Sequence, residues 1–168
     1  MKTTTILALI ALLIVGPTSL YARIGESLAQ CVERYGQYSK EWTPEGKDGS
    51  KSYLFNKGEF EITVSITDNA ADTISYSKSG AGQPSLGASE KSVILKRNYD
   101  GEWKDKPPGP LWLLGVEDYN GGGPWFSGDG KLLAMTGGDN LLIILSAKML
   151  NRANSNAAKE AEDKLQGF

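Results

Sequence analysis

Residues 60–67 alternate strictly between apolar and polar side chains, and this pattern constrains the fold more than any other feature of the sequence. Apolar side chains occupy every second position, at Phe60, Ile62, Val64 and Ile66. The residues between them are glutamate, threonine and serine. A period of two is typical of a β-strand that buries one face and leaves the other in water. The segment therefore predicts a strand in a sheet with one covered face.

Shorter strands are predicted on either side of this one. A strand around 53–55 leads into a turn at 56–58, and a partner strand around 74–76 follows a turn at 68–69. These turns are rich in Asn, Asp and Gly, which favour tight reversals of the chain. The three strands form an antiparallel meander, and Trp42 is expected to anchor a further strand at its edge.

More strands are predicted near the C-terminus. Asp129-Gly130, after the aromatic pair 125–126, is a hairpin signal. Strands are then expected over 132–135 and 141–145. The second is apolar at five successive positions, so we expect it to be central and covered on both faces. A short strand is also predicted at 112–114.

Two helices are predicted in the body of the chain. Ser27 and Gln30 match the capping box that begins a helix. Apolar residues follow at helical spacing, namely Leu28, Cys31, Val32 and Tyr35. This pattern predicts a helix over 28–35 that ends at Gly36. A second helix is predicted over about 88–99.

These elements predict an α+β fold: an antiparallel sheet of about six strands with two helices packed on one face. Each of the halves 23–80 and 86–150 has a short helix, a crossing segment, an aromatic pair before a Gly turn, and then strands. This shared order favours a tandem α-β-β-β repeat joined edge to edge. The alternative is that this similarity between the halves is coincidental, since any α+β chain can repeat such an order of elements. We expect one domain over 23–152, followed by a marginal C-terminal helix or tail over 153–168.

Residues 1–22 have the layout of a secretory signal peptide. Lys2 precedes an apolar run of ten residues from Ile6 to Val15, and Ala22 precedes the expected cleavage point. As a helix the run would reach only ~15 Å, about half the hydrocarbon thickness of a bilayer. An uncleaved anchor is the alternative. The sequence thus predicts an exported protein, periplasmic or extracellular, with no integral membrane span in the mature chain.

The composition excludes several functions. The chain has no histidine, which excludes Ser-His-Asp and Cys-His catalysis and His-ligated zinc. One cysteine, Cys31, cannot form an internal disulfide, and its helical position predicts a buried structural thiol. A net charge of −2 without a basic stripe does not favour nucleic acid. We expect no cofactor and no metal.

Aromatic residues concentrate in a Pro- and Gly-rich stretch, and four of them are candidate partner-binding residues: Trp103, Trp112, Tyr119 and Trp125. Such side chains could form a stacking platform for a sugar or an anchor patch for a protein. The alternative is that they cover the core where regular structure is thin. Both interpretations remain open at the level of sequence.

No catalytic constellation is recognisable. Glu59 and Glu61 are predicted on the solvent-facing side of one strand, about 7 Å apart. On an open surface their environments are alike, so their pKa values would not differ as those of a catalytic acid and base must. The run Gly121 to Pro124 lacks the G-K-[ST] and the strand–loop–helix context of a phosphate loop. We predict that the protein is not an enzyme.

The segment Arg23 to Gly36, RIGESLAQCVERYG, resembles the opening of a group of small exported bacterial proteins. It is also similar to the G-x-[ST]-x-x-[QE]-[VC]-x-x-x-[YLF]-G helix that opens BamE/SmpA-like envelope domains. That resemblance implies two helices on a three-stranded sheet. Its tandem form is known from β-lactamase-inhibitory proteins, which present a sheet face to a partner. BamE-like proteins usually carry a lipidated cysteine at the cleavage site, which this chain lacks.

These observations predict a non-catalytic exported binding or structural module whose partner is a protein or a glycan. The contact surface would be the sheet face or the aromatic loop over 99–126. The alternative is a carboxylate-based, glycan-acting enzyme of the envelope, for which two acidic groups should share a deep pocket.

Overall fold

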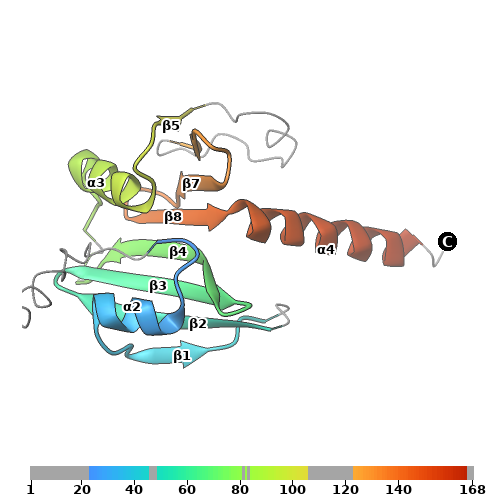
Figure 1. Ribbon diagram of the computed structural model, residues 1–168, viewed down its shortest axis with the longest axis horizontal. Coiled ribbons are helices and arrows are strands. Elements are labelled where there is room, and N and C mark those ends of the chain that lie inside the picture. Colours follow the sequence, from blue (N-terminus) through green and yellow to red (C-terminus); the bar gives the residue numbers. More distant parts are fainter. Residues whose placement is uncertain (1–22, 46–48, 81, 83, 106–122, 166–168) are drawn as a thin grey trace, which may run out of the picture.

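The computed structural model describes residues 23–45, 49–80, 82, 84–105 and 123–165. Its strands form one antiparallel sheet of eight in the order β1-β2-β3-β4-β8-β7-β6-β5 (Figure 1). The strands are β1 (Lys40–Trp42), β2 (Ser50–Lys57), β3 (Phe60–Thr67), β4 (Ala70–Lys78), β5 (Trp103–Lys104), β6 (Trp125–Ser127), β7 (Leu132–Thr136) and β8 (Leu141–Ser146). The described helices are α2 (Leu28–Tyr35), α3 (Ala88–Asn98) and α4 (Ala147–Leu165).

The predicted meander and the helix that precedes it are confirmed. β2, β3 and β4 pair antiparallel in sequence order, and Val64 lies between Tyr53 and Ile74 in the register. α2 begins with the predicted capping box: Ser27 N donates to Gln30 Oε1 at 2.9 Å, and Gln30 N donates to Ser27 Oγ at 3.4 Å. The backbone N–H groups at the start of α2 are therefore satisfied locally.

β8 is the central strand that its apolar sequence predicts. It pairs with β4 on one side and β7 on the other, with Ile74 opposite Ile144 and Tyr76 opposite Leu142. Ile74, Leu142 and Ile144 are completely buried. The strands after α3 therefore join those after α2 through the β4–β8 pair.

α2 and α3 pack on the same face of the sheet. The Tyr76 side chain, from β4, meets both helices: its hydroxyl lies 3.3 Å from Tyr35 Oη of α2 and accepts from Asn98 Nδ2 of α3 at 3.2 Å. One apolar cluster contains residues of both helices and of β2, β3, β4, β7 and β8. This cluster is the main core of the protein.

The opposite face of the sheet is covered only in part. Its β2–β4 region carries mainly hydroxyl side chains, among them Ser65, which lies opposite Thr73. The β6–β8 region carries Phe126, Leu133 and Leu145, against which Met149 and Leu150 of α4 pack. Beyond this base, α4 extends away from the body (Figure 1).

The observed fold differs from the prediction in its number of elements. The sheet has eight strands rather than about six. The edge strand expected at Trp42 is β1, whereas β5, with two residues, is too short to show a period. The terminal helix begins at Ala147, directly after β8 and six positions before the predicted start. The strand predicted at 112–114 and the segment 1–22 lie outside the described residues.

Candidate functional site

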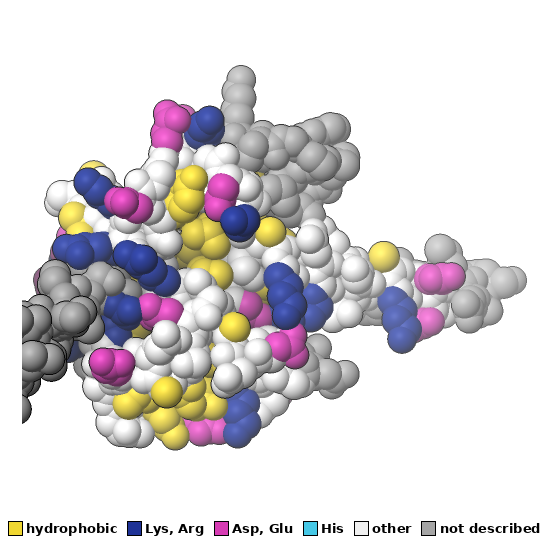
Figure 2. All heavy atoms as spheres, viewed as in Figure 1, with side chains coloured by type: hydrophobic (Ala, Val, Ile, Leu, Met, Phe, Trp, Pro, Cys, Tyr) yellow, Lys and Arg dark blue, Asp and Glu magenta, His cyan; other side chains and the backbone are white. Residues whose placement is uncertain are grey.

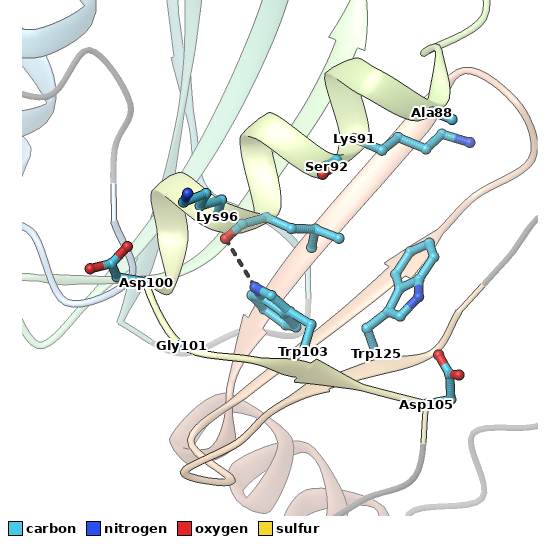
Figure 3. Close-up of a pocket in the computed structure, with 10 residues that line it drawn as sticks. Ala88, Lys91, Ser92, Lys96, Asp100, Gly101, Trp103, Asp105 and Trp125 are labelled. Atoms are coloured by element: carbon cyan, nitrogen blue, oxygen red, sulfur yellow. Dashed lines mark hydrogen bonds between the residues drawn. The ribbon is translucent and has the colours of Figure 1, made fainter.

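A cavity of about 590 Å³ opens between α3 and the β5–β6 strand pair (Figure 3). We call it the tryptophan groove, lined by Ala88, Lys91, Ser92, Leu95 and Lys96 of α3, by Asp100, Gly101, Trp103 and Asp105 around β5, and by Trp125 of β6. Figure 2 shows hydrophobic side chains that reach the surface between α3 and β5–β7, with acidic and basic side chains on either side. The groove is thus apolar at its centre and charged at its rim.

Trp103 is held rigidly in this groove. Its indole N–H donates to the carbonyl oxygen of Leu95 at 3.0 Å, which also accepts the backbone N–H of Tyr99 at the end of α3. Its ring meets the edge of Tyr99 at a centroid distance of 5.9 Å and an angle of 87°. Both contacts fix the plane of the indole before any ligand arrives.

Trp125 forms the second aromatic wall. Its backbone pairs with Ala134 of β7, and its half-buried side chain packs against the main core. Gly123 lies beneath the ring, since a Cβ atom there would come within 3.0 Å of the indole. Among the described residues, the indole N–H of Trp125 meets no hydrogen-bond acceptor.

Charged side chains lie at both ends of the groove. Figure 3 shows Lys96 and Asp100 at one end, and Lys91 and Asp105 at the other, beside Trp125. None of the four forms an ion pair with another residue of the described ranges. The rim therefore offers both donors and acceptors, and its formal charges sum to zero.

The structure brings together two of the four aromatic residues predicted from sequence. Trp103 and Trp125 line the same cavity, whereas Trp112 and Tyr119 lie outside the described residues. Both tryptophans also pack against the core cluster, so the core and binding interpretations apply to the same side chains. The sequence did not identify the groove residues of α3, which are Lys91, Leu95 and Lys96 among others. Nothing in the α3 sequence indicates which of its faces meets β5.

The predicted pair of glutamates on one strand face is wrong. Glu59 precedes β3, in the turn at Gly58, whose φ is 60°. Its carboxylate lies 3.5 Å from Lys78 Nζ, which also pairs with Glu90 of α3 at 2.8 Å. Glu61 lies within β3 and, by alternation with buried Ile62, faces the opposite side. Glu59 therefore lies on the helix side of the sheet, beside Lys78 and α3, and does not share a face with Glu61.

A second cavity, of about 330 Å³, lies between α2 and the β2–β3 turn. Its lining includes Tyr35 and Tyr76, but their hydroxyls already contact each other. Burial raises the pKa of Tyr76 to about 12, which keeps the phenol neutral. These groups belong to the core, and the cavity presents fewer polar groups to a ligand than the tryptophan groove.

Within the described ranges, no cluster of three or more His, Cys, Asp or Glu residues could hold a metal ion. In the same part of the chain, no helix combines the length and the apolarity needed to cross a membrane.

No protein-family model matches the sequence, and no curated protein matches it. Among solved structures, the fold is similar to a cysteine-rich secretory protein from Staphylococcus aureus subsp. aureus Mu50, with a TM-score of 0.48 and 14% sequence identity. The similarity covers 76% of this chain and 44% of that chain, so this chain spans less than half of that protein's length.

Proposed function

We propose that the protein is an exported, non-catalytic binding module, and that the tryptophan groove is where it holds a protein or glycan partner. One observation carries this proposal: two indole rings from separate strands converge on an open cavity whose charged rim has no ion pairs to the described residues. Large aromatic side chains in pockets supply most of the energy at binding sites. Export rests on the sequence of residues 1–22.

The experiment is a pull-down from a bacterial envelope extract with immobilised protein. We expect a component that is retained by the wild type and lost by Trp125→Ala. Trp42→Ala is the matched control, since Trp42 lies in β1, at the other edge of the sheet from β5. Identical retention by all three proteins would contradict the groove as the binding site.

The alternative is a carboxylate-based, glycan-acting enzyme. The observation that favours it is the presence of Asp100 and Asp105 in one cavity. They lie at opposite ends of the groove, with Trp103 between them (Figure 3), whereas glycosidase carboxylates flank the scissile bond. Release of reducing sugar from an oligosaccharide, abolished by Asp105→Asn, would favour the enzyme over the binding module.

We also propose that the fold is a tandem repeat. Each half has one helix followed by four strands, one strand more than the predicted α-β-β-β unit. Exchanging the halves maps the strand order onto itself around the β4–β8 pair. The element order supports this proposal. Two separately expressed chains, divided after Gly80, should reassociate through β4 and β8. Chains that stay apart would count against two self-contained units.

A further inference from the structure

We propose that the ligand of the tryptophan groove is an uncharged glycan chain. This inference rests on the proposed function, because it takes the groove as the binding site. Three properties of the groove carry it: the flat apolar walls, the balanced charges of the rim, and the shortness of the edge strand beside it.

The apolar walls suit sugar rings. A pyranose ring presents an apolar C–H face and an edge of hydroxyl groups. The indole faces of Trp103 and Trp125 offer flat surfaces with a negative π face, which attracts the weakly positive C–H groups. The cavity of about 590 Å³ falls in the range of sites that hold small organic ligands, so it suits a short stretch of a chain.

The aromatic walls of the groove are also preorganised. Trp103 is held by Leu95 and Tyr99, and the Trp125 ring lies against Gly123. A ligand therefore pays little conformational entropy to order them. Preorganised flat surfaces favour a ligand that binds by stacking rather than by inserting a side chain.

The rim selects against charged ligands. Lys91 and Lys96 donate hydrogen bonds, while Asp100 and Asp105 accept them. Sugar hydroxyls do both, so they can satisfy all four side chains. Each end of the groove carries one lysine and one aspartate (Figure 3), so the rim gives an anionic glycan no net electrostatic attraction. The rim thus fits an uncharged polyhydroxyl chain.

A peptide fits the groove less well. Every peptide residue brings a backbone N–H and C=O that need partners, and peptides often satisfy them by adding a strand to a sheet edge. The edge strand beside the groove, β5, has only two residues. A strand this short pairs with little of an extended peptide backbone.

The test begins with a printed array of uncharged and anionic glycans, probed with the purified full chain. The best uncharged glycan is then titrated as a soluble hexasaccharide by calorimetry. We expect binding that changes little between low and high salt, because an uncharged ligand is not screened. Trp125→Ala should weaken it by about tenfold or more, and Trp42→Ala should leave it unchanged. Asp105→Ala, at an exposed position, should weaken it severalfold without disturbing the fold.

Several results would overturn the inference. They are an array with no uncharged binder, a preference for anionic glycans, and hexasaccharide binding that survives both Trp125→Ala and Asp105→Ala. If the envelope pull-down still depends on Trp125 in such a case, the groove remains a binding site and only the glycan class is wrong. If Trp125→Ala also leaves the envelope pull-down unchanged, both the glycan inference and the proposed binding function are wrong.

Discussion

Cys31 lies at the interface of α2 and the sheet and is completely buried. Its place in the apolar stripe of the helix predicted this burial. Burial, together with the negative charge of Glu26, raises the pKa of the thiol to about 11, and the positive charge of Arg34 opposes this shift. Thiolates, not thiols, are the reactive form of cysteine. Cys31 therefore acts as a small apolar side chain.

We predict that Cys31 does not react with a maleimide at pH 7 in the folded protein, because the thiol is both protonated and inaccessible. Intact-mass measurement should show no adduct in native buffer and one adduct per chain in concentrated urea. Rapid labelling of the native protein would contradict the burial of this residue.

The α3 helix is held at its start by Glu90. Its carboxylate accepts from Gly87 N at 2.7 Å and pairs with Lys78 of β4 at 2.8 Å. The hydrogen bond from Lys78 is the main cause that lowers the pKa of Glu90, and the one from Gly87 adds to it. Glu90 thus ties the helix that forms one wall of the groove to the sheet.

This arrangement predicts a dependence on pH. A carboxyl with a lowered folded-state pKa stabilises the protein above its unfolded value of about 4.3, and this stability is lost as the pH falls through the folded value. Glu90→Gln should therefore lower the urea midpoint at pH 7, and the difference from the wild type should shrink as the pH falls toward about 2. A difference that stays constant with pH would contradict the charged pair.

Two ion pairs hold the base of α4. Arg152 pairs with Asp72, whose side chain is only 9% exposed, while Lys148 pairs with Asp68, whose side chain is 67% exposed. Removing the partner of a buried charge costs far more than removing the partner of an exposed one. The two pairs therefore form a matched comparison on one helix.

We expect Arg152→Met to lower the free energy of unfolding by about 3 kcal/mol, since it leaves Asp72 buried and uncompensated. Lys148→Met should cost far less, because water screens the exposed pair. Urea denaturation of the two variants beside the wild type measures both. Equal costs would show that α4 does not rely on the Asp72 contact.

The long elements were predictable, while the short ones were not. The alternation in β3 and the capping box of α2 each follow from contacts within one element. In a strand, side chains i and i+2 lie on the same face. At the start of a helix, the N-cap and N3 residues bind each other's backbone N–H groups. β5 has no such internal pattern and exists through its pairing with β6, where Trp103 lies opposite Ser127. Sequence patterns carry no information about that long-range contact.

The groove was predictable in part for the same reason. Trp103 and Trp125 stood out as aromatic residues in a Pro- and Gly-rich stretch. Their convergence with Lys91 and Leu95 depends on how α3 packs across the sheet. No local period encodes that packing.

At the scale of the whole molecule, the β4–β8 pair joins the two groups of strands into one sheet. Ile144, which is completely buried, lies opposite Ile74 at this junction. The core on the helix side continues across the junction, from Phe55 and Val64 to Leu142 and Ile144. The sheet should therefore unfold as one cooperative unit.

We predict that Ile144→Ala destabilises the protein by about 3 kcal/mol and keeps a single transition. Ile143→Ala is the matched control, with an expected cost of about 1 kcal/mol because Ile143 is half-buried on the other face. Tryptophan fluorescence and far-UV circular dichroism should give coincident urea transitions. Separate transitions would show that the two halves unfold independently.

The binding role of the groove is tested most directly by the indole N–H signals in a ¹⁵N NMR spectrum during titration with the uncharged hexasaccharide. Trp103 and Trp125 line the groove, and Trp42 lies at the opposite edge of the sheet. We predict that the Trp125 signal shifts most, that the Trp103 signal shifts with it, and that the Trp42 signal stays in place. Shifts confined to Trp42, or no shift of Trp125 at saturating ligand, would contradict the groove as the binding site.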